Sequence, residues 1–360
     1  MKLTKILIII QRSNGDVFLS SPLIEHLYKH YINVQIDLLI NDDTLAIAKT
    51  LKHINNIILF SYQEKKNHRF KQEKRIIKSI YNKYDISINL TASDRSVFYS
   101  ILASKYPISA IEKGSYKSWW KKLFLKKYYE FDFTKYILYN NTMPLKLLGI
   151  PFKDIIITAN TPQNAKNSIE HKLSVLGIDK FLIFHPSAQY QYKIYPKQLR
   201  DELLHLLNTL QIPIIVTGSK NEIDLKIKGS LPKLDNILDF IGDTTLEEYI
   251  ALSEVSLGYI GMDTLNMHIA AAQNKKIFAI FGPTILSMWS PWSNQSQENA
   301  TMVSPKQTYG NVTLFQADMP CVACGKAGCD DKHGDSKCLE RIDPYMIYEE
   351  VRNWLTKLAS

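Results

Sequence analysis

The sequence predicts two α/β domains, each built around a parallel sheet. Short apolar runs alternate with amphipathic segments over almost the whole 360-residue chain, which is typical of strand–helix–strand units. A stretch rich in turn formers, Pro151 to Lys166, separates two such alternations, and the chain is long enough for two cores. We therefore place an N-terminal domain at residues 1–160 and a C-terminal domain at 167–342. A last helix within 343–360 is expected to pack back across the interface.

The composition narrows the class of protein. A hydrophobic content of 45% and a charged content of 22% are those of a soluble globular protein, and no apolar run approaches the ~18 residues of a membrane-spanning helix. The apolar N-terminal run continues directly into QRSNGD, without a small-residue cleavage site, so it predicts a strand and not a signal peptide. The net charge of +9 favours an anionic partner. We find no nucleic-acid-binding signature and do not expect nucleic acid.

The first half of the chain begins with a strand that is apolar throughout, Leu3 to Ile10, as a central parallel strand should be. The turn after this strand contains one glycine, where a dinucleotide-binding fingerprint needs three. It places Asp16 at the carboxyl end of the strand, at the start of a helix that reaches about His30. Two interpretations of Asp16 stay open, a helix N-cap, which position alone favours, and a general base. Further elements are expected as strands 35–40, 56–60 and 85–90, and helices 43–51, 69–81 and 128–149.

A basic aromatic segment, KGSYKSWWKKLFLKKYY, begins at Lys113. Its six lysines are interleaved with tryptophan, tyrosine and phenylalanine. A charge run of this kind is often only a solvated face. The interleaved aromatic residues favour a second interpretation, a basic and partly apolar surface that meets anionic lipid headgroups or a phosphorylated glycolipid.

The second half places polar residues after successive strands. Such residues are expected at His185-Pro186-Ser187 with Lys193, at Gly218-Ser219 with Glu222, and at Gly242 to Thr245. The stretch Gly258 to Thr284 then reads as a strand, a helix capped by Asp263 and Thr264, a strand and a Gly-Pro-Thr turn. Because the carboxyl ends of parallel strands meet at one edge and helix N-termini bind phosphate, the sequence predicts a nucleotide or sugar-phosphate site there. The remaining elements are expected as strands 181–185, 213–217 and 236–240, and helices 197–210, 246–253 and 343–358.

All four cysteines lie in one segment, at Cys321, Cys324, Cys329 and Cys338. A secreted disulfide scaffold would distribute them along the chain, so the protein is expected in the cytosol. The Pro-Cys-x-x-Cys beginning resembles the zinc deaminases, but the His-x-Glu or Cys-x-Glu that they need is absent from the sequence. Two interpretations stay open, a structural zinc site and reduced, metal-free thiols in a surface loop.

Taken together, the motifs resemble those of the family-nine glycosyltransferases, the bacterial heptosyltransferases that extend the lipopolysaccharide inner core. The resemblance covers nearly the full length and keeps the order of the motifs. The residues that carry it are Asn14-Gly15-Asp16-Val17 with Pro22, His185-Pro186-Ser187 with Lys193 and Pro196, Gly242 to Leu246, Asp263-Thr264 with His268, and Phe281 to Thr284.

The resemblance implies a metal-independent, inverting transferase of the GT-B type, with two facing Rossmann-like domains and an interdomain cleft. It implies ADP-L-glycero-D-manno-heptose as donor and an anionic glycolipid, the lipid A-core, as acceptor. The enzyme would work in the cytoplasm, peripherally at the inner face of the cytoplasmic membrane, and would need no cofactor for its chemistry.

Roles carried over from the family make Asp16 the base, with the donor held in the C-terminal domain. Ser187 and Lys193 would contact the diphosphate, Glu222 the ribose and Thr244 the adenine. Asp263, Thr264 and His268 would lie around the phosphates and the sugar, although His268 also fits a hydrogen-bonded structural histidine. In the N-terminal domain, the candidates for acceptor binding are Arg95, Lys113 and Lys117.

Two positions depart from the family pattern. Leu265 stands where the family usually has glycine, and Ala188 stands where a second small polar residue is common. Two alternatives therefore stay open, the same fold with a different nucleotide sugar, and a non-catalytic sugar-nucleotide or metal-binding partner in envelope assembly.

Overall fold

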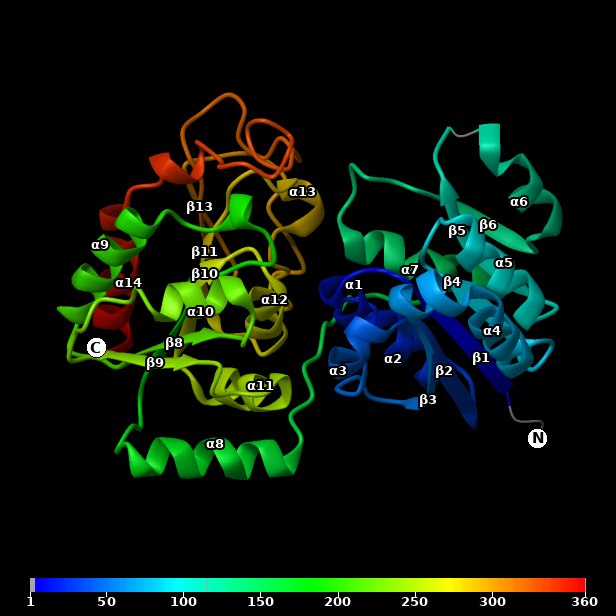
Figure 1. The fold of residues 1–360 in the computed structure, drawn as a ribbon, viewed down its shortest axis with the longest axis horizontal. Helices are drawn as coiled ribbons and strands as arrows, with labels where there is room; N and C mark the ends of the chain where they lie inside the picture. Colours follow the sequence, from blue (N-terminus) through cyan, green and yellow to red (C-terminus); the bar gives the residue numbers. More distant parts are fainter. Residues whose placement is uncertain (1–3, 115, 360) are drawn as a thin grey trace. The chain divides into compact units, whose positions relative to one another are not determined.

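The computed structural model describes residues 4–114 and 116–359, without the side chains of Lys117 and Ala359. Its contacts divide the chain into two compact units, Met1–Asn160 and Thr161–Ser360, which we call the N-terminal and C-terminal units. Each unit contains one sheet with helices packed against it (Figure 1). In the described part of the chain, no helix combines the length and the apolar character that crossing a bilayer requires.

The N-terminal unit contains a six-stranded sheet with the order β3-β2-β1-β4-β5-β6, and every pair of neighbouring strands is parallel. Its strands are β1 Thr4–Ile10, β2 Val34–Asn41, β3 Ile54–Phe60, β4 Ile86–Asn89, β5 Pro107–Glu112 and β6 Lys127–Phe131. Its α-helices are α1 Asn14–Phe18, α2 Ser21–His30, α3 Leu45–Ala48, α4 Tyr62–Ile80, α5 Asp94–Ala103, α6 Trp119–Phe124 and α7 Ile137–Leu148, with 3-10 turns at Asp42–Thr44 and Tyr116–Ser118.

The C-terminal unit contains a seven-stranded sheet with the order β12-β13-β11-β10-β7-β8-β9, in which only β12 is antiparallel to its neighbour. Its strands are β7 Leu182–His185, β8 Ile214–Gly218, β9 Ile237–Ile241, β10 Gly258–Met262, β11 Lys276–Ile280, β12 Lys306–Tyr309 and β13 Val312–Phe315. Its α-helices are α8 Gln163–Val175, α9 Lys197–Asn208, α10 Glu222–Lys228, α11 Leu246–Val255, α12 Leu265–Ala272, α13 Leu286–Trp289 and α14 Pro344–Ala359, with 3-10 turns at Gln191–Lys193 and Leu339–Arg341.

The two sheets repeat one topology. In each, the first strand (β1 or β7) lies centrally, the next two strands extend the sheet to one side, and the chain then returns to the other side at β4 or β10. The order of strands reverses between β1 and β4 and between β7 and β10, and open α/β sheets bind ligands at such switch points, outside the carboxyl ends of the strands. The predicted fold class, two Rossmann-like domains with parallel sheets, is confirmed.

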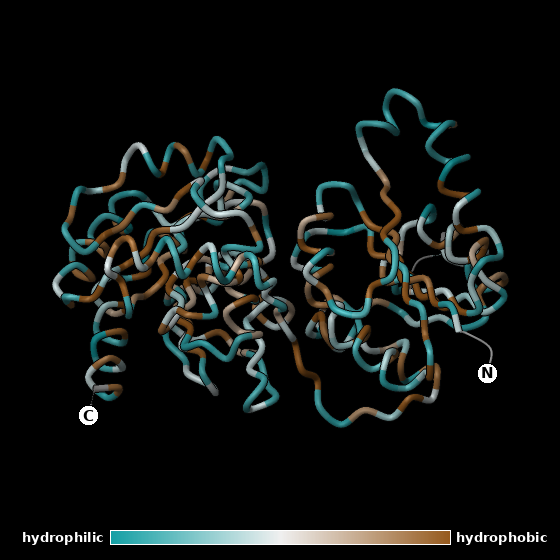
Figure 2. Tube along the Cα trace, turned by 90° about the horizontal axis from the view of Figure 1, so that it is seen from below, coloured by the Kyte–Doolittle hydropathy of each residue, from teal (hydrophilic) through white to brown (hydrophobic). Residues whose placement is uncertain are grey.

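Burial explains why the central strands read as continuous apolar runs. Residues 6–10 of β1 are buried on both faces of the sheet, as parallel strands covered by helices must be. In Figure 2 the interior strands of both units are largely brown, whereas α14, which leads to the end marked C, alternates between brown and teal. This helix packs on α9, and its Trp354 contacts Phe278 of the C-terminal core. Its expected packing across the interdomain interface stays a prediction.

Two predicted helices are corrected by the structure. The helix expected over 128–149 begins only at α7, because residues 127–131 form strand β6, in which Tyr129 and Phe131 are buried and alternate with exposed neighbours. The helix expected from Asp16 to His30 is interrupted after α1, and α2 starts anew at Ser21 with Pro22 in its first turn, where proline is tolerated. The predicted helix end at Gly149 is confirmed by its left-handed backbone, with φ of 74°.

Candidate functional site

The switch point of the N-terminal sheet holds Asp16, on the short helix α1 that follows β1. Ser13, and not Asp16, is the N-cap of α1, and Asp16 occupies the third helical position. The Ser13 hydroxyl donates to Asp16 Oδ2 at 2.7 Å and the Ser13 amide N–H donates to the same oxygen at 3.3 Å. The carboxylate therefore has a fixed orientation. The interpretation of Asp16 as the N-cap residue is wrong, because Asp16 lies three residues after the N-cap.

The other carboxylate oxygen of Asp16 forms an ion pair with Arg12. Arg12 Nε lies 2.8 Å from Asp16 Oδ1, and the guanidinium rests over the ring of Phe131, 4.8 Å from its centroid. The Arg12 carbonyl also accepts a hydrogen bond from Asn41 Nδ2 at 3.3 Å. Arg12 is not among the residues predicted from the sequence, although the i,i+4 spacing of arginine and aspartate was a signal for this pair.

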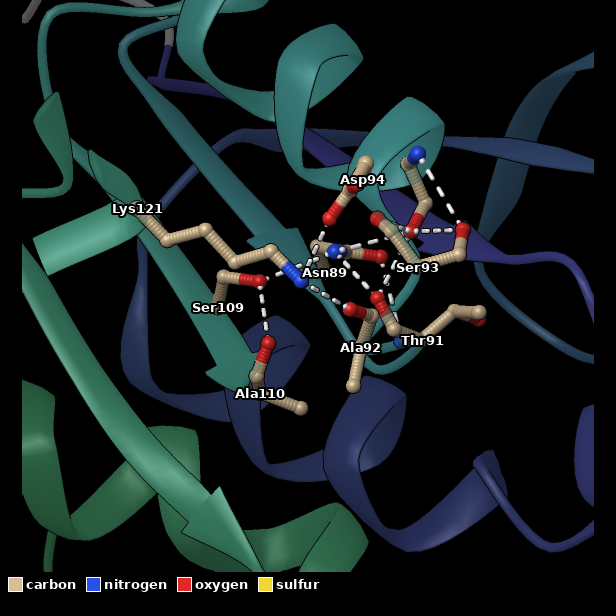
Figure 3. A network of polar contacts seen from close by, with 9 residues as sticks. Asn89, Thr91, Ala92, Ser93, Asp94, Ser109, Ala110 and Lys121 are labelled. Carbon is tan, nitrogen blue, oxygen red and sulfur yellow. Dashed lines mark hydrogen bonds and ion pairs between the residues drawn. The ribbon is translucent and has the colours of Figure 1, made fainter. Parts of the chain in front are cut away.

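The loop after β4 forms the other side of this switch point. The Gln11 amide donates to Thr91 Oγ1 at 3.0 Å, which ties the loop after β1 to the loop after β4. Asn89 Nδ2 donates to the Thr91 carbonyl at 2.6 Å and to Ser109 Oγ at 2.8 Å (Figure 3). These buried polar groups hold the β4–α5 loop rigidly beside the turn that carries Asp16.

The candidates for acceptor binding, Arg95, Lys113 and Lys117, all belong to the N-terminal unit. Arg95 stacks on Phe60, 3.8 Å from its centroid, and its Nε donates to Gln11 Oε1 at 3.3 Å, so it belongs to the edge that carries Asp16. Lys113 extends from the end of β5, with its Nζ 3.6 Å from Asp132 Oδ2. The side chain of Lys117 lies outside the described residues.

The switch point of the C-terminal sheet brings together Lys193, after β7, and Asp263, after β10. Lys193 Nζ donates to Asp263 Oδ2 at 3.1 Å. Burial alone would lower the pKa of the Lys193 ammonium, but the Asp263 carboxylate outweighs it, and the net effect is a raised pKa. A cation is thus held next to the N-terminus of α12, where Thr264 is the N-cap residue as predicted.

Buried polar groups connect the same two loops. His185 Nδ1 lies 3.0 Å from Thr217 Oγ1 and accepts from Asn266 Nδ2 at 3.0 Å, and Ser187 Oγ lies 3.4 Å from His185 Nε2. Burial lowers the pKa of His185 to about 4, and the nearby Asp224 carboxylate opposes this only in part. His185 is therefore neutral at pH 7 and can orient Ser187. Asn266 is not among the residues predicted from the sequence, and its only signal there was its position in the first turn of α12.

His268 lies deeper in α12 and is also buried. Burial lowers its pKa to about 4, so the imidazole is neutral at pH 7, and the Asp263 carboxylate offsets the shift only partly. Among the described residues its Nδ1 has no hydrogen-bond partner. A buried, unsatisfied ring nitrogen costs about 1–3 kcal/mol, so this histidine is not a fully satisfied structural one.

Comparison with known proteins decides the family. The model of glycosyltransferase family 9 (heptosyltransferase) matches residues 73–316. The chain belongs to glycosyltransferase family 9. It is 26% identical over 353 residues to a lipooligosaccharide heptosyltransferase 2 of Campylobacter jejuni, covering 95% of this chain and 96% of that one. It is 25% identical over 299 residues to a lipopolysaccharide heptosyltransferase 3 of Escherichia coli, covering 79% and 85%. The structure of the E. coli ADP-heptose lps heptosyltransferase II matches with a TM-score of 0.74 at 17% identity, covering 99% of this chain and 100% of that one.

Two donor-binding candidates of this family 9 chain stand apart from the Lys193–Asp263 pair. Glu222 begins α10, its side chain is 82% exposed, and it pairs with Lys226 at 2.8 Å. The hydrogen bond from Lys226 lowers the pKa of Glu222. Thr244 is half-buried in the turn before α11. Among the described residues neither side chain is hydrogen-bonded to the Lys193–Asp263 pair, so their roles stay proposals.

The cysteine segment of this family 9 chain is a loop that packs on the turn after β11 and on Tyr192 of the C-terminal unit. Its Ala323 amide donates to the Gly282 carbonyl at 3.3 Å, and the ring of His333 lies 5.6 Å from that of Tyr192. Cys338 is buried, and burial raises the pKa of its thiol to about 11. Across the described residues, no group of three or more His, Cys, Asp or Glu side chains is arranged to hold a metal ion. The structure thus does not assemble the zinc site that the spacing suggested for Cys321, Cys324, Cys329 and Cys338.

Proposed function

We propose that this chain transfers a heptose from ADP-L-glycero-D-manno-heptose to the inner core of lipopolysaccharide or lipooligosaccharide, with inversion at the anomeric carbon. The observation that carries the proposal is the placement of one oriented carboxylate, Asp16, at the switch point of one sheet. A cation–carboxylate pair, Lys193 with Asp263, stands at the switch point of the other sheet. The names of the relatives, heptosyltransferases of lipopolysaccharide and lipooligosaccharide, support the sugar and the class of acceptor.

In the proposed reaction Asp16 is the general base. It takes the proton of the acceptor hydroxyl as that oxygen attacks the anomeric carbon, while the bond from the anomeric carbon to the ADP oxygen breaks on the opposite face. The Ser13 hydrogen bonds to Oδ2 and the Arg12 ion pair with Oδ1 fix the orientation of the Asp16 carboxylate. A positioned carboxylate contributes about 10²–10⁴-fold to a transfer of this kind.

The departing diphosphate is stabilised by the C-terminal unit. Lys193 supplies a full positive charge, and the first N–H groups of α12 supply further donors, so the proposed step needs no metal ion. Ser187 and Thr264 are proposed to donate to phosphate oxygens, and neutral His268 to hydrogen-bond the sugar. Glu222 and Thr244 are proposed to contact the ribose and the adenine.

We propose that the enzyme works in the cytoplasm on an anionic lipid A-core acceptor, with peripheral contact to the membrane that carries it. Arg95, Lys113 and Lys117 are proposed to bind the acceptor's anionic groups. A second candidate function is transfer from another nucleotide sugar, which Leu265 favours because it adds bulk where relatives of this family usually have glycine. A third is a non-catalytic sugar-nucleotide partner in envelope assembly.

The test combines a donor panel with one substitution. ADP-heptose should raise the melting temperature of the purified protein more than UDP- or GDP-sugars do, because a ligand stabilises only the state that it binds. Transfer to a heptose-deficient core acceptor should fall by about 10²–10⁴-fold in Asp16→Asn, with the shift by ADP-heptose retained. Full activity of Asp16→Asn would contradict the base assignment. A larger shift with a UDP- or GDP-sugar would favour the second candidate, and binding without any transfer or hydrolysis would favour the third.

A further inference from the structure

Helix α6 of the N-terminal unit has its burial pattern inverted. Within the helix Lys121 is only 1% exposed and Trp120 is partly buried, and the flanking Ser118 and Leu125 are buried as well. Apart from Lys122, the outward side chains are large and apolar. Trp119 is 66% exposed and Leu123 is 70% exposed, and Tyr116 and Phe124 are also exposed. A short surface helix normally places such residues toward the core and its lysines outward, so this segment is built to present apolar surface.

The inversion is held in place by the buried lysine. Lys121 Nζ donates to the carbonyl of Ala92 in the β4–α5 loop at 2.7 Å and lies 2.8 Å from Oδ1 of Asp94, the first residue of α5 (Figure 3). Leu125 packs in a small cluster with Val97 and Ile111. Rolling the apolar face of the helix inward would break both contacts of Lys121, so these contacts favour the observed orientation.

The charge of the segment fits one class of surface. Residues 113–127 contain six lysines and no carboxylate. Lys122 and Lys126 are exposed beside the apolar side chains, and Lys122 Nζ lies 5.4 Å from the centroid of the Tyr128 ring. Tryptophan and lysine that alternate on one face match the interface of a bilayer, where rings lie at headgroup level and ammonium groups meet lipid phosphates.

We propose that Tyr116, Trp119, Leu123 and Phe124, flanked by Lys122 and Lys126, form a docking surface for an anionic phospholipid bilayer. The helix has six residues, so it lies on the membrane and does not cross it. The proposal deepens the proposed function and rests on it in one respect, that a lipid-linked acceptor gives the enzyme a reason to be at a membrane. A second copy of the chain is the rival occupant, but a self-complementary interface would set this lysine-rich surface against its own charge.

The experiment measures binding of the full-length protein to vesicles without any acceptor. Vesicles of phosphatidylethanolamine with phosphatidylglycerol should bind the protein, and vesicles of phosphatidylcholine should bind it much more weakly. Trp119→Ser/Leu123→Ser/Phe124→Ser should weaken binding by at least about tenfold. Lys122→Gln/Lys126→Gln should weaken it by about thirtyfold at low salt and by less at high salt. Met302→Ser, at a side chain that is 77% exposed on the C-terminal unit, is the matched control and should bind like the wild type.

Two further measurements separate the possible failures. Brominated lipid should quench wild-type tryptophan fluorescence, and Trp119→Phe should remove most of that quenching while binding is retained. Transfer to a lipid-free core oligosaccharide should be unchanged in the triple variant, so a lost docking surface is distinguished from a wrong function. Equal binding of wild type and triple variant to anionic vesicles would overturn the proposal. If the wild type formed a concentration-dependent dimer and the triple variant did not, the proposal would be overturned, and a second copy of the chain would be the occupant of this surface.

Discussion

The switch points of the two sheets have the same topology but carry different charged groups. At the N-terminal one, the carboxylate of Asp16, the proposed base, is paired with Arg12, and Arg95 lies on the same edge. At the C-terminal one, two histidines are buried and neutral, and Lys193 is the cation, held by Asp263. The first edge suits an acceptor whose anionic groups can bind the two arginine side chains. The second is a largely neutral, preorganised site around one charge, which suits a diphosphate that gains charge during the reaction.

Of the two cations, Lys193 and Arg12, removal of Lys193 at the C-terminal switch point should have the larger effect. Lys193→Met should weaken binding of ADP-heptose by about a hundredfold, because the diphosphate loses a charged partner and Asp263 is left facing it. Isothermal titration with ADP-heptose measures this loss. The matched control is Lys220→Met, at an exposed lysine in the loop after β8, which should change the affinity little. Equal losses in both variants would show that only general positive charge matters.

The neutral histidines make the C-terminal unit sensitive to acid. The pKa of His268 is about 4 when folded and close to 6.5 when unfolded, so between these values the unfolded chain binds a proton that the folded one does not. The contribution of neutral His268 to the free energy of unfolding is therefore fully present above pH 6.5 and is lost as the pH falls toward 4. At pH 5 about 2 kcal/mol of this contribution is lost.

Urea unfolding at pH 7.5 and pH 5 tests this dependence. His268→Gln should reduce the difference in unfolding free energy between the two pH values, whereas His205→Gln, at an exposed histidine of α9, should leave it unchanged. The same pH dependence in wild type and His268→Gln would mean that other groups cause the acid lability.

The arginine of the N-terminal switch point should have a smaller effect than the lysine of the other. Arg12→Gln should lower kcat by about tenfold with little change in KM for ADP-heptose, because the variant loses the group that orients Asp16 and leaves the donor site intact. Arg75→Gln, which breaks the exposed ion pair with Glu64 on the same unit, is the control and should keep full activity. A rise in KM for the donor with unchanged kcat would contradict the assignment of Arg12 to the acceptor half.

The comparison also shows what the sequence can predict. Alternating apolar runs predicted most strands, and residues just after them, such as Lys193 and Asp263, were selected because parallel strands end at one edge. Asn266 was missed because its partner, His185, is brought to it by a tertiary contact, whereas Arg12 was missed although its i,i+4 spacing to Asp16 was visible in the sequence. Strand β6 was missed although its tyrosine and phenylalanine residues favour strands, because its alternation of buried and exposed residues extends over only five positions.

The smallest effect concerns the lysine that faces inward on α6. A charge run such as residues 113–127 suggests solvated lysines, yet Lys121 is buried and Trp119 is exposed, because Asp94 and the Ala92 carbonyl satisfy the ammonium. Lys121→Met keeps the length of the side chain but loses both contacts, and should destabilise the N-terminal unit by about 1 kcal/mol. The effect is small because the Asp94 carboxylate is solvent-exposed and is not left buried without a partner. The melting temperature should fall by about 2–4 °C, and anionic vesicle binding should weaken as α6 loosens. Lys122→Met, at the neighbouring exposed lysine, should leave the melting temperature unchanged, and equal melting temperatures for both variants would show that Lys121 does not hold the helix.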